Sequence, residues 1–518
     1  MPRSFVAIDL ETTGLDVGRD RITEIGMVRF TLDGVSDSFE ALVNPERPIP
    51  LRIQQITGIS DADVSDALHF NALRLKVEDF IGEAAIVGQN VSFDLGFLAD
   101  EGVEPRGPVF DTLELASLLE PELRDRSLGA LAQHYGVEMP VAHRALADAD
   151  ATRAVFLALY EQARSLPEAL LAGLVALDAP LPPGLEEAEA PGWAVAELLR
   201  EIARERGLVV GARRIAVPSP LRRDGRPAPP SPQRSLDQLV VEQAADAEPE
   251  RPATAPLSDL LVSRGPSSLP SRPPRLAELA ASGTSLPEQS LAVLRAGAAH
   301  AELFGTFEDR PEQVGMTRAV AQALESDENL VVEAGTGTGK SLAYLIPAAL
   351  WAMRHGRRVI VSTNTINLQE QLVQMDAPAL RELIRDSLSD EVADALRVVT
   401  LKGRRNYLCL RRVAQERVAG PASDAEASLL GRILVWLQAT DSGDRSELVL
   451  SNAEDANWAH YSAEGEDCLS GGNCPYVRDG SCFLLGARNA EEADHVVIVN
   501  HALRLCDLAA GGTALPQA

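Results

Sequence analysis

The sequence opens with a short apolar run that ends in two acids, residues 5–14 (FVAIDLETTG). Four consecutive apolar residues indicate a buried strand, and Asp9 and Glu11 point to the same side of it because side chains on a strand alternate faces. Two carboxylates side by side repel each other unless a divalent cation lies between them, and hard oxygen ligands suit Mg²⁺ or Mn²⁺. Taken alone, such a pair more often marks a strand with an acidic exposed face, so the decision rests on the rest of the chain.

The length and composition of the chain exclude several classes of protein. A length of 518 residues is too great for one core and predicts two or three domains. A 45% content of hydrophobic residues, without an apolar run long enough to span a membrane, predicts a soluble globular protein. The first strand follows residues 1–4 directly, leaving no room for a signal peptide, so we expect a cytoplasmic protein. The net charge of -28 argues against a protein that coats nucleic acid, so DNA contacts are expected to be local and partly mediated by metal ions.

Further predicted elements in the first 165 residues carry two more acids. Residues 22–30 and 38–43 are predicted strands joined by a turn at 32–34, and residues 84–88 are a fourth strand. Asp94 comes just beyond the end of that strand, at the start of a predicted helix. Another helix opens at 143–148 and would lay Asp148 beside its buried stripe, which comprises Ala145, Ala149, Thr152, Val155 and Leu159.

Three motifs form an ordered set: Asp-x-Glu-Thr-Thr-Gly from Asp9, Asn-x-x-Phe-Asp ending at Asp94, and His-x-Ala-x-x-Asp from His143 to Asp148. This set resembles the DnaQ-like exonucleases of the DEDDh group, the proofreading-type 3′-5′ exonucleases, and residues 57–59 (TGI) match another segment usual in that family. The resemblance covers residues 1–165 and implies a ribonuclease-H-like mixed sheet with flanking helices. It also implies that His143 is the general base and that two metal ions are held by Asp9, Glu11, Asp94 and Asp148.

The chemistry of phosphodiester hydrolysis explains these residue types. Two cations about 4 Å apart can clamp both the attacking and the leaving oxygen, and four carboxylates supply the cage that holds them. A metal-bound water still has to lose a proton, and a histidine with an ordinary pKa of about 6.5 is suited to accept it. We therefore expect His143 to act as a base, although a lone histidine before a helix is more often structural.

The composition changes after residues 166–167, and we interpret residues 166–285 as a linker with one helical island. Residues 193–206 are predicted to form a short amphipathic helix that Gly207 ends. Residues 217–274 are rich in Pro, Ser and Arg, which is typical of a semi-rigid or disordered connector. A solvated linker is preferred to a DNA-tethering patch as the interpretation of its basic residues, Arg213, Arg214, Arg222, Arg223, Arg226 and Arg234.

A second motif, Ala-Gly-Thr-Gly-Thr-Gly-Lys-Ser at 334–341, lies in residues 286–518. A predicted strand at 329–332 precedes it and a predicted helix through Leu345 follows, which is the setting in which backbone amides cradle phosphates. We expect Lys340 to contact the outer phosphates of ATP and Ser341 to contact magnesium. The remaining cradle residues are Gly335, Thr336, Gly337, Thr338 and Gly339.

The segments around this loop resemble those of superfamily 2 helicases. Residues 307–313 (FEDRPEQ) resemble the adenine-contacting segment, with Gln313 in the base-reading role and Arg310 beside it, and residues 359–372 resemble a motif that touches the DNA backbone. Residues 401–409, the later cysteines and residues 497–503 resemble the iron-sulfur helicases of the DinG and XPD group. The implied architecture is an α/β chain in which residues 286–518 are a partial RecA-like P-loop helicase domain with an iron-sulfur insertion at 402–487.

The five cysteines all lie in the last quarter of the chain. In a reducing compartment, such a cluster favours a metal site over disulfides. The spacing of Cys409, Cys468, Cys474 and Cys482 differs from the Cys-x2-Cys pairs of most structural zinc sites. A 4Fe-4S cluster held by these four thiolates fits better than zinc or free thiols, and the resemblance implies the same cofactor. Cys506 is expected to be an ordinary buried thiol.

Basic residues crowd around the first of these cysteines. They form either a patch that holds DNA phosphates or a solvated face, and the acidity of the rest of the chain favours the patch. The residues are Lys402, Arg404, Arg405, Arg411 and Arg412.

A P-loop ATPase also needs a second acid at a strand end. No apolar run ending in Asp-Glu follows Lys340, and the run at 496–499 ends in Asn500-His501. In the DinG family the Asp-Glu-Ala-His box comes shortly after such a segment, so we expect this chain to be truncated before it and unable to unwind DNA by itself.

The preferred hypothesis is a metal-dependent 3′-5′ exonuclease that acts on single-stranded DNA or 3′ ends and is fused to a DinG-like helicase. The alternative is an ATP- and DNA-binding module in which the nuclease is idle or regulatory. A third hypothesis, a stand-alone proofreading subunit with an unrelated tail, is disfavoured by the ordered helicase motifs.

Overall fold

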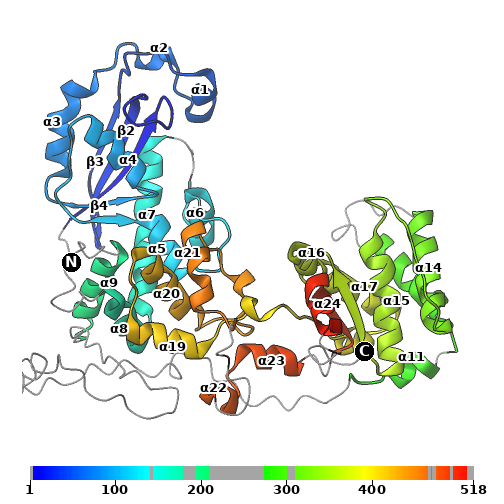
Figure 1. Ribbon diagram of the computed structural model, residues 1–518. Helices are drawn as coiled ribbons and strands as arrows, with labels where there is room; N and C mark the ends of the chain where they lie inside the picture. The colour runs from blue at the N-terminus through cyan, green and yellow to red at the C-terminus, as the bar shows by residue number, and fades with distance from the viewer. Residues whose placement is uncertain are drawn as a thin grey trace, which may run out of the picture. The chain divides into compact units, whose positions relative to one another are not determined.

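The computed structural model describes residues 4–139, 144–178, 194–208, 273–281, 283–299, 310–464, 468, 474–490, 494–509 and 511 (Figure 1). The chain divides into two compact units. Unit 1 comprises residues 1–262, 412–440 and 446–461, and unit 2 comprises residues 263–411, 441–445 and 462–518.

Unit 1 is built on a five-stranded mixed sheet with the order β3-β2-β1-β4-β5. Its strands are β1 (Phe5–Thr12), β2 (Ile22–Thr31), β3 (Gly34–Leu42), β4 (Ala85–Gly88) and β5 (Val109–Asp111). β2 pairs antiparallel with β1 and β3, whereas β1, β4 and β5 run parallel. The predicted strands at 22–30, 38–43 and 84–88 and the hairpin turn at 32–34 are therefore confirmed, with small shifts at their ends.

Helices of unit 1 from the first part of the chain are α1 (Leu51–Thr57), α2 (Asp61–Val64), α3 (Phe70–Ile81), α4 (Ser92–Asp100), α5 (Thr112–Leu119), α6 (Leu128–Tyr135), α7 (Ala145–Ser165), α8 (Glu168–Val175), η1 (Ala176–Asp178) and α9 (Ala194–Glu205). α20 (Asp424–Trp436), α21 (Asn452–Asn457) and η7 (Trp458–His460) come from much later in the sequence, while α19 (Leu410–Ala419) and η6 (Arg445–Glu447) cross the boundary between the units. α9 confirms the short helix predicted at 193–206.

The long helix α7 packs across β1 and β2 (Figure 1). All members of its predicted stripe are buried: Ala145, Ala149, Thr152, Val155 and Leu159. Phe156 from α7 lies 5.4 Å from the ring centroid of Phe5 and completes an aromatic cluster with Phe30 and Phe110. A Cβ on Gly26 would lie 2.1 Å from the Ala145 carbonyl carbon, so glycine at this position of β2 allows the start of α7 to approach the sheet.

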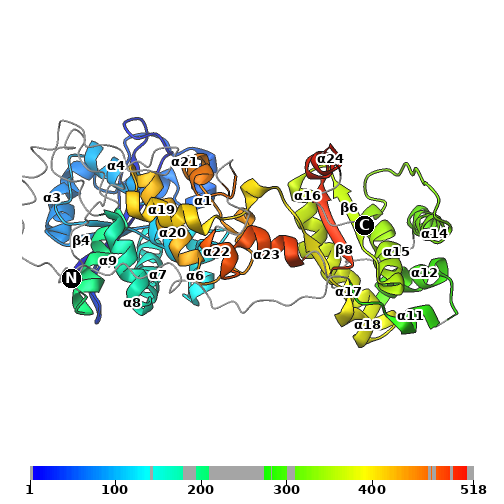
Figure 2. The same cartoon turned by 60° about the horizontal axis from the view of Figure 1, so that its bottom comes forward.

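Unit 2 has a three-stranded parallel sheet of β6 (Val359–Thr363), β8 (Val496–Asn500) and β7 (Val398–Thr400), with β8 in the middle. β6 and β8 of this sheet are labelled in Figure 2. Successive residues of β8 pack into different hydrophobic cores, because side chains on a strand alternate between its two faces. Val496 and Ile498 pack into the helical core that includes α15 and α17, whereas Val497 and Val499 pack with Tyr407 and the region of the cysteines.

The helices and turns of unit 2 are α11 (Ala277–Ala281), α12 (Leu286–Ala296), η3 (Gly297–Ala299), α14 (Pro311–Ser326), α15 (Lys340–His355), α16 (Ile366–Gln371), η4 (Leu372–Asp376), α17 (Ala377–Ser387), α18 (Asp390–Ala395), η5 (Arg404–Asn406), α22 (Pro475–Arg478), α23 (Phe483–Ala490) and α24 (His501–Ala509). Among the described residues, no helix is both long enough and apolar enough to cross a membrane.

The strand predicted at 329–332 is wrong: these residues have no regular secondary structure. A strand needs a neighbour to bond its backbone, and none of the described strands pairs with this segment. Its apolar side chains are consequently exposed, with Val331 97% accessible.

Candidate active site

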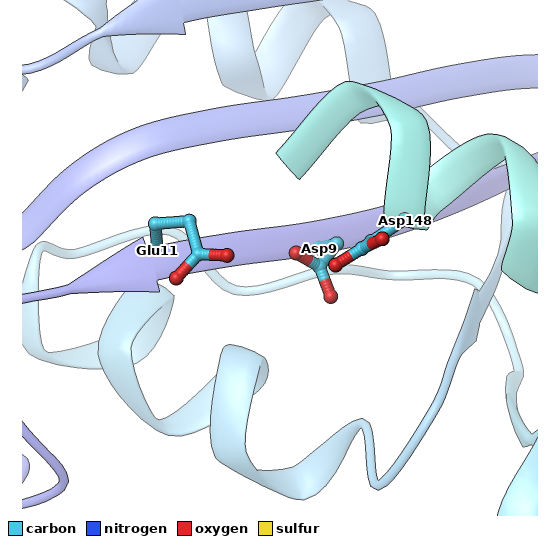
Figure 3. A group of neighbouring side chains, drawn as sticks. All are labelled: Asp9, Glu11 and Asp148. Atoms are coloured by element: carbon cyan, nitrogen blue, oxygen red, sulfur yellow. The ribbon is translucent and has the colours of Figure 1, made fainter. Parts of the chain in front are cut away.

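Two elements bring three acids together in unit 1. Asp9 and Glu11 lie two positions apart on β1, opposite Gly26 and Glu24 of β2, and Asp148 lies in the first turn of α7. One carboxylate oxygen from each acid lies within 4.8 Å of the others. Figure 3 shows Asp9 and Asp148 facing each other, with the Glu11 carboxylate pointing along β1 toward them.

Asp94 approaches the same strand from α4. Its side chain is 4% exposed, and its Oδ1 accepts a hydrogen bond of 2.9 Å from the Leu10 backbone amide, between Asp9 and Glu11. The turn before α4 is held by Asp111, whose carboxylate accepts bonds of 3.0 Å from the amides of Asn90 and Val91. Asn90 adopts a left-handed φ of 57°, a conformation that asparagine tolerates better than most residues. Asp94 is thus fixed beside the three-acid cluster.

The acids of the site are held with their charges close together and away from water. Burial raises the pKa of Glu11 to about 7, and the charges of Asp148 and Glu24 add to the rise. Burial also raises the pKa of Asp94 to about 8, although hydrogen bonds from backbone amides act to lower it. The pKa of Asp9 is raised by burial first, then by Asp94 and Asp148. A divalent cation fits this donor set because it would offset the repulsion that these shifts report.

A glutamate outside the motifs fixes the start of α7. Glu24 is fully buried on β2, and its Oε2 accepts a 2.9 Å bond from the Ala145 amide. Its Oε1 pairs with Arg144 Nη2 at 2.7 Å. Because Ala145 is the first residue of α7, this carboxylate anchors the turn that carries Asp148. The sequence prediction missed Glu24, since a single acid within a strand gives no signal of burial.

The predicted base, His143, lies outside the described residues. Its neighbour Arg144 is described and held by Glu24, so the chain immediately after His143 is anchored close to the acids. The basic segment at 213–234 and residues 307–309 also lie outside the described part of the chain.

The glycine-rich loop at 334–341 leads into α15, which begins at Lys340. Lys340 Nζ donates to the carbonyl oxygens of Ala334 at 3.1 Å and Gly335 at 2.5 Å. Gly337 and Gly339 have φ values of 80° and 72°, in the left-handed region that glycine adopts without strain. Two glycines of the loop therefore adopt the left-handed conformation that a tight turn before a helix requires.

Both residues predicted to contact the nucleotide base region touch this loop. Gln313 on α14 donates from Nε2 to the Gly339 carbonyl at 3.0 Å, and Arg310 bonds to the Gly337 carbonyl. The Thr338 hydroxyl donates to the Gly335 carbonyl at 3.0 Å and tightens the turn, while Thr336 lies within it. Ser341, the second residue of α15, hydrogen-bonds Tyr344.

Four cysteines line a single pocket in unit 2. The pocket encloses about 590 Å³ of empty space, part of it open to solvent, and its cysteines are Cys409, Cys468, Cys474 and Cys482. Burial raises the pKa of the Cys482 thiol, and the charges of the other three thiols raise it further, so these three lie close to Cys482. Convergent thiols with apolar neighbours fit a metal or iron-sulfur group. Cys506 is exposed on α24, so the prediction that it is buried is wrong.

Only part of the basic patch predicted around Cys409 is exposed on the surface, where it could contact DNA phosphates. Lys402 is buried, with Nζ paired to Glu370 at 3.2 Å and to Asp444 at 2.8 Å, so it is a structural cation and not a surface contact for phosphate. Arg412 donates to the Ala459 carbonyl at 2.8 Å. Arg404 and Arg405 remain exposed.

Comparisons with known proteins agree with the order of these sites. A family model described as exonuclease (RNase T) matches residues 6–156, and one described as DEAD/DEAH box helicase matches residues 316–387. The 3′-5′ exonuclease DinG of Bacillus subtilis (strain 168) is 28% identical over 99% of this chain and 48% of its own length. The corresponding protein of Staphylococcus aureus (strain USA300) is 25% identical over 87% of this chain and 43% of its own length. This chain joins an RNase T/DnaQ-like exonuclease domain to a DinG-family helicase region.

Two further relatives match one part of this chain each. The ATP-dependent helicase DinG of Mycobacterium tuberculosis (strain ATCC 25618 / H37Rv) is 40% identical over 40% of this chain and 32% of its own length. The solved structure of exonuclease X in complex with 5′ overhanging duplex DNA is 28% identical and covers 30% of this chain and 91% of its own, with a TM-score of 0.27. The chain spans about half, or less, of the length of the curated relatives it matches. Residues 4–139 and 144–178 are called the exonuclease domain below.

Proposed function

We propose that this chain is a divalent-metal-dependent 3′-5′ exonuclease acting on DNA, joined to the ATP-binding part of a DinG-like helicase. The observation that carries the proposal is the convergence of Asp9, Glu11 and Asp148 within 4.8 Å, with Asp94 bonded to the strand between the first two. Relatives named 3′-5′ exonuclease DinG that match most of this chain support the same activity.

Each acid has a distinct part in the proposed site. Asp9 lies between Glu11 and Asp148, and these three acids would hold two Mg²⁺ or Mn²⁺ ions, which would supply charge neutralisation and an activated water. Asp94 completes the set from α4, and its bond to Leu10 keeps its carboxylate at β1. His143 accepts the proton of the attacking water in this proposal. The Glu24–Arg144 pair holds the start of α7, the helix that bears Asp148.

We further propose that the loop at 334–341 binds ATP in a partial RecA-like domain. Lys340 already bonds the loop's carbonyl oxygens, and it would exchange them for the outer phosphates of the nucleotide. Gln313 and Arg310 contact the same loop, which supports assigning them to recognition of the nucleotide base.

The pocket of Cys409, Cys468, Cys474 and Cys482 is the proposed site of a 4Fe-4S cluster. Its four thiols satisfy the ligand count of such a cluster, and the raised pKa of the Cys482 thiol would be offset by bound iron.

The nuclease proposal is tested with a 5′-labelled single strand of DNA in the presence of Mn²⁺ or Mg²⁺. Shortening from the 3′ end is expected for the wild type, together with a loss of at least about hundredfold for Asp9→Asn and for His143→Ala. Asp37→Asn, which removes an exposed carboxylate from β3, is the matched control and keeps full activity. Failure of the folded wild type to shorten DNA or RNA with either metal would refute the proposal.

The alternative, a DNA- and ATP-binding module with an idle nuclease, is favoured by the intact nucleotide loop. This alternative predicts that the chain binds DNA in an ATP-dependent way and that the Asp9→Asn variant still binds it. It also predicts that no nucleotides are released. The same assay therefore distinguishes the two functions, because the nuclease proposal requires product and the alternative forbids it.

A further inference from the structure

A helical segment from the helicase region lies within the same compact unit as the exonuclease domain. Residues 412–440 and 446–461 belong to unit 1, and we call them the helical arm. In the sequence the arm falls between Cys409 and Cys468, and it contains α20 and α21. It is separated from the exonuclease domain along the chain by more than two hundred residues, so its place in unit 1 has to be maintained by packing.

The second half of α20, the central helix of the arm, is buried on every side and is apolar except for Arg432. From Leu429 to Trp436 each residue of α20 is buried. A helix that is buried all round needs cover on all its faces, and its own arm supplies part of this cover through α21 and the residues before it, Glu447 and Val449. The remaining cover comes from α5, α8 and η1 of the exonuclease domain, which pack against α20 (Figure 1). α5 and α8 present buried leucines of their own, including Leu118 and Leu171.

Backbone hydrogen bonding joins the arm to the loop after α5. The Pro121 carbonyl accepts one bond of 2.9 Å from Arg126 of the same loop and one of 3.2 Å from the Val449 amide of the arm. The Val449 carbonyl in turn accepts from Arg432 of α20, whose Nη1 pairs with Glu454 at 2.6 Å. This ion pair is buried, so the arm presents a fixed surface to the loop.

Side chains of the two parts also meet at Trp436. Its Nε1 donates to Glu447 of the arm at 3.0 Å and also hydrogen-bonds Glu122 of the exonuclease domain. A buried indole needs a partner for its N–H, and here the partners come from both sides of the contact. Three kinds of contact therefore join the arm to the exonuclease domain: apolar packing, a backbone hydrogen bond and the indole N–H of Trp436.

We propose that α20 is a docking surface for the exonuclease domain and that its partner is the face formed by α5, α8 and the loop 120–126 of the same chain. The contact makes the arm a folding partner of the exonuclease domain. Because the two ends of the arm lead into the segments that carry Cys409 and Cys468, it also gives the exonuclease domain a second attachment to the helicase region, independent of the residues that connect them in sequence.

Hydrogen exchange of the full chain, followed by mass spectrometry, tests this contact from the arm side. Trp436→Ala opens the face of α20, and we expect amides of α5 and α8 to exchange at least about tenfold faster while those of β1 keep their protection. Leu383→Ala, an equally buried position on α17 of unit 2, is the matched control and leaves α5 unchanged. Faster exchange in the arm without any change in α5 or α8 would overturn the proposal.

The reciprocal test perturbs the exonuclease domain and measures the arm. Arg126→Ala removes a half-buried side chain that shapes the loop at Pro121 without opening either core, so the chain stays folded. Exchange at residues 446–461 is expected to rise at least about fivefold, whereas Arg124→Ala, an exposed neighbour, has no effect. Equal exchange of the arm in the wild type and in Arg126→Ala would refute docking even if the Trp436 variant proved too unstable to study.

Discussion

Glu24 is expected to control the position of Asp148 although it is not a proposed ligand. α7 has no side-chain cap of its own at Arg144, and the Glu24 carboxylate accepts from the Ala145 amide instead. Asp148 follows Ala145 by less than one helical turn, so a shift of the helix start moves its carboxylate directly. Glu24→Ala removes this anchor and leaves the Ala145 amide buried without its partner.

The magnitude follows from the partners that are lost. A buried donor left without an acceptor costs about 1–3 kcal/mol. The pair with Arg144 adds less than a fully buried ion pair, because the arginine side chain is 44% exposed. We therefore expect Glu24→Ala to lower the free energy of unfolding by about 2–4 kcal/mol and to weaken Mn²⁺ binding at least about tenfold.

Glu24→Gln separates geometry from charge. The amide oxygen can still accept from Ala145, while loss of the negative charge removes one of the groups that raise the pKa of Asp9 and Glu11. Mn²⁺ should bind this variant more tightly than Glu24→Ala, because the start of α7 stays bonded and Asp148 keeps its position.

Calorimetric Mn²⁺ titration and denaturant unfolding of both variants provide the measurement, with exonuclease rate as a further readout. Unchanged Mn²⁺ affinity and rate in Glu24→Ala would refute the positioning role. Equal losses in Glu24→Ala and Glu24→Gln would show that the charge of Glu24, and not its bond to the helix, is what the site needs.

Three other outcomes are expected elsewhere in the chain. Lys340→Ala should weaken ATP binding at least about tenfold by calorimetry while leaving exonuclease activity intact, and unchanged affinity would contradict the assignment of the loop. Cys474→Ala should abolish iron content and visible absorbance in anaerobically purified protein, whereas Cys506→Ala, at an exposed cysteine outside the pocket, should keep both. His495 is buried and neutral, with Nε2 bonded to Pro274 and Nδ1 accepting from the Arg397 amide, and burial lowers its pKa below 6.5. Its contribution to stability is therefore present above pH 6.5 and lost on acidification, so the fall in unfolding free energy between pH 7.5 and about pH 5 should be smaller in His495→Gln than in the wild type.

Local patterns in the sequence were sufficient for the exonuclease sheet and for most of its acids. The apolar run before Asp9, the strand before Asp94 and the helical stripe beside Asp148 each depend on nearest neighbours in the chain, and each element is present in the structure. The convergence of three acids within 4.8 Å followed from the order of the motifs and their resemblance to a known family.

Features that depend on distant partners were not predictable in this way. Burial of Glu24 requires Arg144 and Ala145, more than a hundred residues away, and burial of Lys402 requires Glu370 and Asp444. The apolar residues at 329–332 have the composition of a strand, but composition cannot supply the neighbouring strand that the segment lacks among the described residues. The packing of α20 on the exonuclease domain could not be predicted either. The apolar pattern of α20 indicates that the helix is buried, but it does not identify the elements that bury it.

The electrostatics of the site explain why a residue outside the ligand set has to hold its shape. With pKa values of about 7 for Glu11 and about 8 for Asp94, the folded, metal-free domain retains protons that the unfolded chain has released. Its stability therefore falls as pH rises from the ordinary carboxyl pKa values, 4.5 for Glu11 and 3.8 for Asp94, to these raised ones, and the ionised ligands then push one another apart. A bound cation reverses the repulsion, but it cannot assemble ligands that are not already near. The bonds from Glu24 to α7 and from Leu10 to Asp94 do not depend on the cation, so they preserve the geometry in which it can bind.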